Sequence, residues 1–577
     1  MNQTTLTGKA SIDKPWLKYY PTELLDNLQI PFCTMNQYLQ YNMPGMDVPA
    51  IHYYGTDITW AEVFENTEKI ARSLKVLGCK EGDQVPSFLR SVPEFISLFL
   101  AAERVGASIL CRMNSLKENM EAVASAGSHF MFAHDFLTVE EMNTFLSGTS
   151  VEKIILLPPC NSCDIEAMPD YVRNSLNENY TGECAHGPAI MTWDEFLALG
   201  ENFTGEVDAP FNPDRPLFRC YTSGSTGPSK QVIHSAHSLI GVLGQMNFYG
   251  GREGIRPTWM VTTLPPTLVA VVTSMMLLPL ASNKLLIQNP WVAPDDIDLE
   301  LMRLKPNNWP LIPMFMECLL LSKRIPADYD LSHLFTAGAG AEACNNAQLR
   351  AFRKFMDEHN CHIPFTTGYG SSEAGSNLTF HISGRPVGNY HVGCPMPLTT
   401  VAIFKPGTTE EVGYNEFGEI CVTGPGVMLG YNLPENTAKA LITHPDGKVW
   451  LHMGDIGAMD EDGNIRNAGR GTNRRFGGGF LDFLIMENLV ADAEIPGVRD
   501  QFFVNVPDQE HEGYFLPYLY VVLEEGHSIE EIHSAVHEAL EPHMYPVEIR
   551  QVSRRPYWQF KTNRFGLVRE ILAEKQN

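Results

Sequence analysis

A dense run of glycines and hydroxyl residues at positions 221–230 is the segment of this chain best suited to chemistry. Glycines let the main chain approach a ligand, and successive N–H groups form a concavity that binds anions. Lys230 adds a positive charge. We therefore predict a phosphate site, although a flexible Ser/Gly surface loop has the same composition and no Gly-Lys-Ser/Thr of a P-loop follows. The run comprises Tyr221, Thr222, Ser223, Gly224, Ser225, Thr226, Gly227, Pro228, Ser229 and Lys230.

The rest of the chain must provide a scaffold for this loop. Its 577 residues correspond to roughly four domains' worth of sequence and need no cross-links to stabilise a core. The net charge is −26, which disfavours nucleic acid and anionic membranes as partners. The apolar stretch 264–281 is interrupted by prolines and hydroxyls, and residues 1–14 lack the apolar segment of a signal peptide. With its 12 cysteines scattered, we expect a cytoplasmic chain without an integral membrane segment.

Alternating strand and helix patterns predict an α/β fold with mostly parallel sheets. The apolar spacing predicts helices over 58–79, 93–107, 296–304 and 341–359, and strands over 153–157, 259–263 and 284–288. After about residue 380 the pattern changes to short, turn-rich strands over 401–404, 419–423 and 449–452.

A glycine and arginine cluster over 469–479 is the best candidate for a linker. The sequence beyond it contains strands over 501–506 and 516–523 and a helix over 528–540, which is enough for a small α+β domain. The predicted division is therefore 1–470 and 471–577.

The glycine run resembles the signature Thr-Ser-Gly-Ser-Thr-Gly-x-x-Lys of the adenylate-forming superfamily, which includes acyl-CoA synthetases, peptide-synthetase adenylation domains and beetle luciferases. It departs at Ser229 and Gln231, because the family has Pro-Lys-Gly where this chain has Ser229-Lys230-Gln231. Other family motifs follow in order. They are Thr336-Ala337-Gly338-Ala339-Gly340, Gly368-Tyr369-Gly370-Ser371-Ser372-Glu373, Met453-Gly454-Asp455-Ile456-Gly457 and Gly469-Arg470.

The resemblance implies a role for each motif. Gly338, Ala339 and Gly340 would line an adenine. In the next motif Tyr369 would stack near it, a hydroxyl would meet phosphate, and Glu373 would bind Mg²⁺, which prefers hard oxygen ligands. Asp455 would hold the ribose hydroxyls and Arg470 would lead into a hinge near Thr472. Lys230 and Glu373 are the expected catalytic residues, and Gly368, Gly370, Ser371 and Ser372 complete the nucleotide site.

The implied reaction is ATP plus a carboxylic acid giving acyl-AMP and pyrophosphate, followed by transfer to coenzyme A. The run from Asp13 to Pro21 resembles the Pro-Trp-Leu-Lys-x-Tyr-Pro opening of long-chain fatty acyl-CoA synthetases, and Leu268 stands where acyl-CoA synthetases carry His. A fatty or aromatic acid would suit the apolar residues and methionines nearby, although methionine is also an ordinary core filler. The methionines concerned are Met260, Met275, Met276, Met314 and Met316.

Coenzyme A is the expected acceptor because Gly477-Gly478-Gly479-Phe480 resembles the Gly-Gly-Phe turn beside the pantetheine tunnel of CoA ligases. In that family the small domain is a lid that turns between the two steps. A carrier protein or an amine could replace coenzyme A, and a degenerate relative would bind nucleotide without turnover. His234 and His237 are predicted to begin a helix rather than to bind a ligand.

The C-terminus departs from the family pattern Pro-Lys-Thr-x-x-Gly-Lys-x-x-Arg, whose second Lys bridges the carboxylate and the α-phosphate. Residues 560–569 read Phe-Lys-Thr-Asn-Arg-Phe-Gly-Leu-Val-Arg. Lys561, Thr562 and Arg569 keep the register, so Gly566 stands at the position of that lysine. The resemblance implies slow adenylation with intact thioester formation, which uses the other face of the lid, unless Lys561 or Arg564 substitutes.

Overall fold

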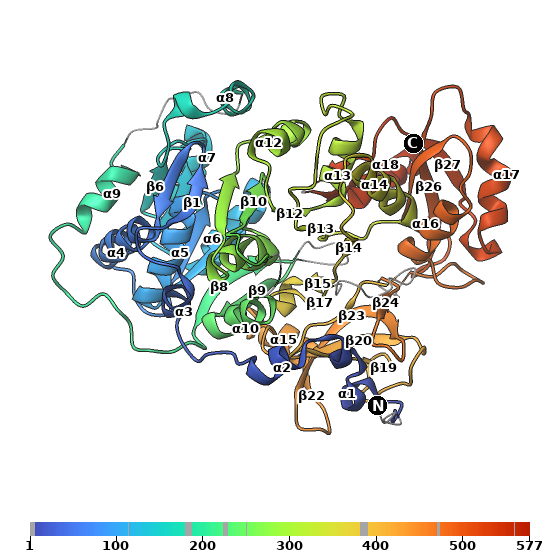
Figure 1. Cartoon of the computed structure of the whole chain (residues 1–577), viewed down its shortest axis with the longest axis horizontal. Helices are drawn as coiled ribbons and strands as arrows, with labels where there is room; N and C mark the ends of the chain where they lie inside the picture. The colour runs from blue at the N-terminus through green and yellow to red at the C-terminus, as the bar shows by residue number, and fades with distance from the viewer. Residues whose placement is uncertain are drawn as a thin grey trace.

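Two mostly parallel sheets form the larger part of the molecule (Figure 1). The computed structural model describes residues 6–113, 115–178, 187–222, 229–247, 249, 251–380, 391–469, 473–558 and 560–576. The first sheet has the order β14 (Phe365–Thr367), β13 (Thr336–Ala339), β12 (Asn308–Leu311), β10 (Thr258–Thr262), β11 (Leu285–Asn289), β1 (Pro49–Tyr53) and β2 (Thr56–Thr59). The second has the order β21 (Gly430–Tyr431), β9 (Gln231–Ser235), β8 (Pro216–Tyr221), β4 (Ser108–Cys111), β3 (Gln84–Phe88), β5 (Phe130–His134), β6 (Lys153–Leu157) and β7 (Ile190–Thr192).

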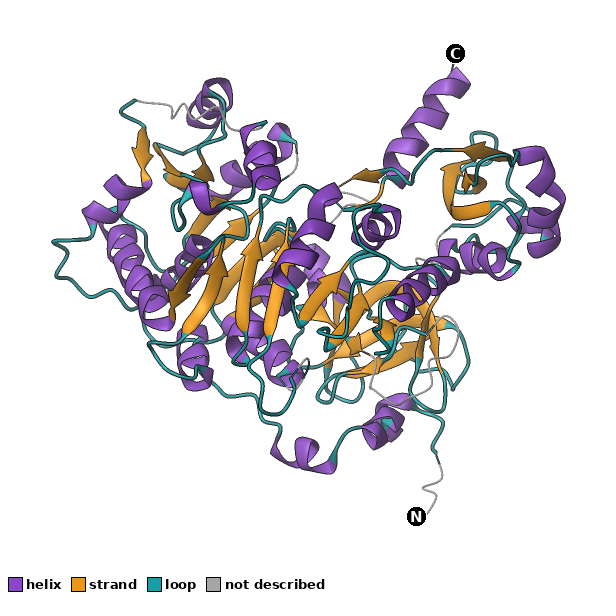
Figure 2. Ribbon diagram, turned by 45° about the horizontal axis from the view of Figure 1, so that its top comes forward, coloured by secondary structure: helices purple, strands orange, loops and turns teal. Residues whose placement is uncertain are grey.

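Helices cover the sheets (Figure 2), and one hydrophobic core joins both sheets. Helix α4 shows why the sequence folds so: the Thr59 side chain accepts a hydrogen bond from Glu62 N–H, and Glu62 returns one to Thr59 N–H. The main helices here are α4 (Trp60–Val76), α5 (Pro93–Val105), α6 (Leu116–Ala126), α7 (Val139–Gly148), α9 (Trp193–Leu199), α10 (Ala236–Met246), α12 (Ile297–Leu304), α13 (Pro313–Leu321) and α14 (Asn346–Glu358).

A third, antiparallel sheet follows residue 400, where the turn-rich strands were expected. Its order is β19 (Thr400–Phe404), β20 (Gly418–Thr423), β23 (Val449–Met459) and β22 (Leu441–Thr443), with β24 (Ile465–Asn467) beside β23. The beginning of the chain lies against this sheet (Figure 1). Lys18 pairs with Asp462, and Ser11 donates to Glu411.

The C-terminal residues build a smaller part with hydrophobic clusters of its own. It consists of α16 (Phe483–Asp492), β25 (Val498–Pro507), β26 (Phe515–Leu523), α17 (Ile529–Ala539), β27 (Glu548–Gln551), β28 (Tyr557–Trp558), β29 (Lys561–Thr562) and α18 (Arg564–Gln576). Helix α16 lies against α14 of the larger part, where Asn346 N–H donates to Asn488 at 2.7 Å. The boundary predicted at 470 and 471 falls outside the described residues and stays a prediction.

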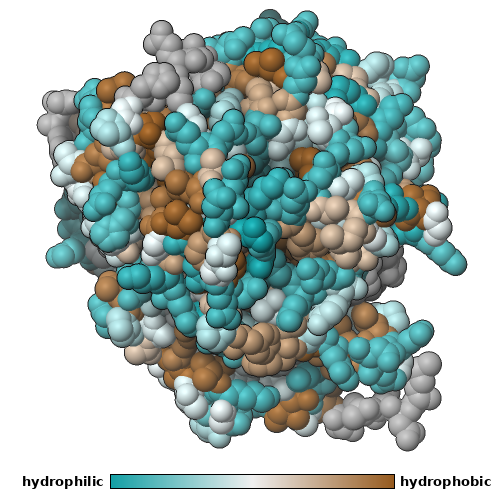
Figure 3. Space-filling view, turned by 90° about the vertical axis from the view of Figure 1, so that its left-hand side faces the viewer, coloured by the Kyte–Doolittle hydropathy of each residue, from teal (hydrophilic) through white to brown (hydrophobic). Residues whose placement is uncertain are grey.

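The predicted α/β class with a small C-terminal α+β part is confirmed, but the bounds of several predicted elements were wrong, most of all in two of them. The helix expected over 341–359 begins at Asn346, because Ala341 has a left-handed φ of 67° and Asn345 caps the helix. The strand expected over 449–452 continues to Met459. On the face shown in Figure 3, hydrophobic side chains occur in small groups among hydrophilic ones. Among the described residues, no helix is long and apolar enough to cross a bilayer.

Candidate functional site

A cavity of about 200 Å³ lies at the carboxyl edge of the first sheet, where parallel strands commonly present ligand sites. One part of its lining, which we name the main-chain wall, consists of residues 338–341, 367, 368 and 370–372 at the ends of β13 and β14 and just beyond them. A second part of the lining, the aromatic wall, consists of Tyr249, Trp259, Trp309 and Phe380. The cavity therefore joins a main-chain surface to an apolar pocket.

The main-chain wall requires glycine at position 370. A Cβ there would lie 1.8 Å from the Ser376 carbonyl oxygen, because β15 (Gly370–Ser371) pairs closely with β16 (Ser376–Asn377). At Gly340 a Cβ would meet nothing within 4 Å, so packing of the fold does not require glycine there. The missing side chain instead leaves the cavity open at this position. The predicted residues Gly338, Ala339, Gly340, Gly368, Gly370, Ser371 and Ser372 all line the cavity.

Hydrogen bonds hold together the two ends of the predicted phosphate loop. Thr222 N–H donates to the Lys230 carbonyl at 2.9 Å, and Lys230 N–H donates to Thr222 Oγ1 at 3.0 Å. Ser229 Oγ donates to the Thr222 carbonyl at 2.5 Å. The loop residues between these ends, Ser223, Gly224, Ser225, Thr226 and Gly227, lie outside the described residues, as does Arg470.

Lys230 and Glu373, the two predicted catalytic residues, are linked by Tyr431. The Tyr431 hydroxyl donates to Glu373 Oε1 at 2.8 Å, and the Lys230 ammonium lies 5.0 Å from the centre of the same ring. Glu373 is also held through its main chain, where its carbonyl accepts from Met428 N–H at 2.9 Å. The carboxylate is thus oriented by a buried tyrosine beside an exposed cation.

His234 binds the main chain of the residue before Glu373, a role that the sequence did not reveal. The prediction that His234 begins a helix is wrong: it lies in β9, while α10 starts after Ser235. Its Nε2 donates to the Ser372 carbonyl at 2.7 Å, and burial lowers the pKa of the imidazole to about 4. The ring is therefore neutral at pH 7 and carries its proton on Nε2.

Asp455 lies in β23 next to a bulge at Gly454, whose φ is +71°. The Tyr369 hydroxyl donates to Asp455 Oδ2 at 2.5 Å. The structure thus brings these two predicted residues together, although neither is among the residues that line the cavity.

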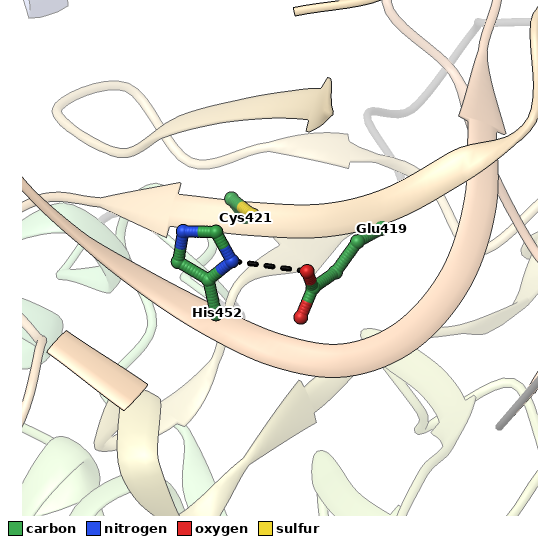
Figure 4. Close-up of side chains that lie close together, drawn as sticks. All are labelled: Glu419, Cys421 and His452. Carbon is green, nitrogen blue, oxygen red and sulfur yellow. Dashed lines mark hydrogen bonds and ion pairs between the residues drawn. The ribbon is translucent and has the colours of Figure 1, made fainter. Parts of the chain in front are cut away.

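Glu419 holds the bulge at Gly454 and lies beside Cys421 and His452 (Figure 4). Glu419 accepts from Gly454 N–H at 3.2 Å and contacts His452 Nδ1 at 3.0 Å. Glu419, Cys421 and His452 offer ligand atoms within 4.8 Å of one another, a geometry that could hold a metal ion. Burial raises the pKa of the Cys421 thiol far above its usual range. Through this bond to Gly454 N–H, Glu419 fixes the main chain of the residue before Asp455.

Gly478 and Gly479 lie away from the cavity in the small part. They pack against His543, where a Cβ at either position would come within 2.7 Å of the imidazole side chain. Their predicted contact with coenzyme A stays a prediction.

The aromatic wall and Lys561 were not predicted as parts of one site. Of the five methionines considered, only Met275 lines the cavity, together with Leu268. The others are core residues; for example, Met276 accepts from Gln288. Helix α10, η3 (Val271–Leu277), β10, β12 and the 556–561 hairpin all contribute, so no local motif signals the pocket.

Comparison with known proteins supports the resemblance. A model of the family described as "AMP-binding enzyme" matches residues 40–432, a span that contains every cavity-lining residue except Phe560 and Lys561. The 4-coumarate–CoA ligase 3 of Oryza sativa subsp. japonica is 26% identical over 429 residues, covering 71% of this chain and 69% of the relative. A long-chain-fatty-acid–CoA ligase of Bacillus subtilis (strain 168) is 25% identical over 548 residues, covering 92% and 93%. The anthranilate CoA ligase AuaEII, solved in complex with anthranoyl-AMP, shares the fold with a TM-score of 0.77 at 16% identity, covering 96% of this chain and 100% of that one.

Proposed function

Because the chain belongs to the AMP-binding enzyme family, we propose that it activates a carboxylic acid with ATP and transfers the acyl group to coenzyme A. The observation that carries this proposal is the single cavity with two unlike sides. The main-chain wall offers N–H groups and hydroxyls to a nucleotide, and the aromatic wall offers an apolar surface to the body of an acid. Such a cavity brings a carboxylate close to a phosphate.

Lys230, Tyr431 and Glu373 would act on the phosphates. The reaction joins two anions, so positive charge and donors aimed at the phosphates lower the barrier. Glu373, oriented by Tyr431, has the hard oxygen ligands that Mg²⁺ prefers, and its neighbours Ser371 and Ser372 add hydroxyls. A Mg²⁺ ion held there would neutralise phosphate charge. Asp455 would accept hydrogen bonds from the ribose.

The aromatic wall favours an acid with a compact apolar body, in the fatty or aromatic class. Trp259 and Trp309 are nearly fully buried and belong to the lining. Both substrate types occur among the relatives, whose names include a 4-coumarate–CoA ligase and a long-chain-fatty-acid–CoA ligase. Residues 471–577 would form the lid that turns between the two reaction steps.

The test is acid-dependent release of pyrophosphate from ATP across a panel of aromatic and aliphatic acids, with and without coenzyme A. We expect release that depends on the acid, and an acyl thioester only when coenzyme A is present. Glu373→Gln serves as the inactive control. If the acyl group is transferred to an amine or a carrier protein and no coenzyme A thioester forms, coenzyme A is not the acceptor. Binding of ATP without turnover for any acid would contradict the proposal.

A further inference from the structure

Three side chains of different chemistry face one another on the third sheet (Figure 4). Glu419 and Cys421 are two positions apart in β20, so they point to the same face of the sheet. On the neighbouring strand β23, His452 lies directly opposite Cys421 in the antiparallel register. The register of the sheet therefore brings together a carboxylate, a thiol and an imidazole.

The ligand atoms of these side chains have the spacing of a metal site that is open by a small amount. The Glu419 carboxylate lies 3.0 Å from His452 Nδ1, and the three ligand atoms lie within 4.8 Å of one another. A tetrahedral zinc ion with bonds of about 2.0–2.3 Å places its ligand atoms roughly 3.3–3.6 Å apart. Side-chain movements of about 1 Å would therefore close the three around one ion.

The Cys421 thiol is the feature that an ion pair between the other two residues does not explain. It is fully buried, and it makes no hydrogen bond within the part of the chain that the structure describes. A buried cysteine often serves as a small apolar residue, but here it lies beside a carboxylate and an imidazole. A thiolate together with an imidazole is a donor set that suits Zn²⁺ and does not suit Mg²⁺ or Ca²⁺.

A second layer of hydrogen bonds orients two of these groups. His444 Nε2 lies 2.9 Å from His452 Nε2, and burial lowers the pKa of His444, so a neutral His444 can accept from His452 Nε2–H. That bond leaves the lone pair of His452 on Nδ1, toward the carboxylate. Histidines that bind metals commonly donate their other ring N–H in this way, and carboxylates that bind metals are themselves hydrogen-bonded. Glu419 meets the second condition through Gly454 N–H, at 3.2 Å.

We propose that Glu419, Cys421 and His452 bind one Zn²⁺ ion, with water at the fourth position. This site lies apart from the cavity and does not depend on the proposed function. Binding breaks the S–H bond of Cys421: its proton passes to water, and its electron pair forms the bond from sulfur to the ion. His452 binds in its neutral form. The ion would join β20 to β23 next to the bulge at Gly454.

The test measures the zinc bound to the full chain after its metal is removed with a chelator and the chain is dialysed against Zn²⁺. The parent is compared with Cys421→Ala and His452→Gln. Cys163→Ala is the matched control, because Cys163 lies beside Cys160 and this pair could also attract zinc. Co²⁺ in place of Zn²⁺ reports the ligand, since a bond from cobalt to a thiolate gives a charge-transfer absorption that oxygen and nitrogen ligands do not give. Thermal midpoints of the metal-free proteins show which variants are folded.

We expect about one Zn²⁺ per chain in the parent and in Cys163→Ala, with the cobalt–thiolate absorption in both. Cys421→Ala should lose the absorption and bind zinc more than about 10-fold more weakly, since even changes outside the ligand shell cost this much. Zinc should raise the thermal midpoint of the parent but not that of Cys421→Ala, because only the parent's folded state binds the ion. If Cys421→Ala does not fold, the weaker zinc binding expected of His452→Gln gives the same test.

Three results would overturn the proposal. The first is a parent that retains no zinc after dialysis. The second is zinc binding at the parent level in folded Cys421→Ala or His452→Gln. The third is zinc bound without the cobalt–thiolate absorption, or an absorption that disappears in Cys163→Ala, because either would place the ion at other side chains.

Discussion

The main-chain wall and the aromatic wall face the same cavity but are built in different ways. The main-chain wall uses backbone atoms of two adjacent strand ends, and its residues lie within short runs of sequence. The aromatic wall uses side chains from elements that are more than 130 residues apart, from Tyr249 to Phe380. We infer that the main-chain wall binds the nucleotide, which is the same for every acid, and that the aromatic wall contacts the body of the acid, which differs from one acid to another. Variants on the two sides should therefore fail in different ways.

The largest effect is expected at Glu373, which serves the nucleotide regardless of the acid. Glu373→Gln should lower acid-dependent pyrophosphate release by roughly 10²–10³-fold for every acid. Tyr431→Phe removes only the hydrogen bond that orients the carboxylate and should cost about 1 kcal/mol. If the loss at Glu373 differed strongly between acids, the two walls would not be separable.

Asp455→Ala should weaken binding of AMP-containing ligands by about 1–3 kcal/mol, because it removes the charge-assisted hydrogen bond that we propose between the Asp455 carboxylate and the ribose. Calorimetric titration with a non-hydrolysable acyl-adenylate analogue measures the change. Asp462→Ala is the matched control, since Asp462 pairs with Lys18 elsewhere on the molecule. Equal affinity of Asp455→Ala and the parent would remove Asp455 from the site.

On the aromatic side, Met275→Ala should lengthen the pocket and change the preference among acids. We expect the ratio of kcat/KM for a longer acid to that for a shorter one to rise about 10-fold, as differences of one or two methylenes commonly do. Met276→Ala is the control, because Met276 is the next residue in the chain but is buried and does not line the cavity. A preference shifted equally by both variants would indicate general loosening rather than pocket size.

The smallest effect concerns pH. Burial lowers the pKa of His234 to about 4, so the unfolded chain binds the proton more readily between pH 6.5 and pH 4. The contribution of His234 to the free energy of unfolding is therefore fully present above pH 6.5. It is lost on acidification, by about 2 kcal/mol between pH 7 and pH 5. His234→Gln retains a donor for the Ser372 carbonyl but does not titrate. The free energy of unfolding, measured with denaturant at pH 7 and pH 5, should therefore fall less in His234→Gln than in the parent. An equal fall in both proteins would contradict this prediction.

The same contrast explains which features the sequence predicted. The placing of Gly368, Gly370, Ser371 and Ser372 at one site could be predicted because they lie in a short motif that resembles a family signature, and all four line the cavity. Strand 153–157 could be predicted because a continuous apolar run is typical of a strand buried on both sides. His234 could not be assigned, because its partner Ser372 lies 138 residues away. The position of Lys561 beside the cavity could not be assigned either, because its neighbour Thr562 is held by Glu342, which lies 220 residues away. Contacts between distant segments leave no pattern in a single sequence.

The most direct test of the account is exchange of labelled pyrophosphate into ATP in the absence of coenzyme A. Reversible acyl-AMP formation predicts exchange that requires an acid with a compact apolar body and that disappears in Glu373→Gln. Exchange without any acid, or ATP binding with no exchange for any acid in the panel, would contradict the claim that one cavity unites a nucleotide site with an acid site.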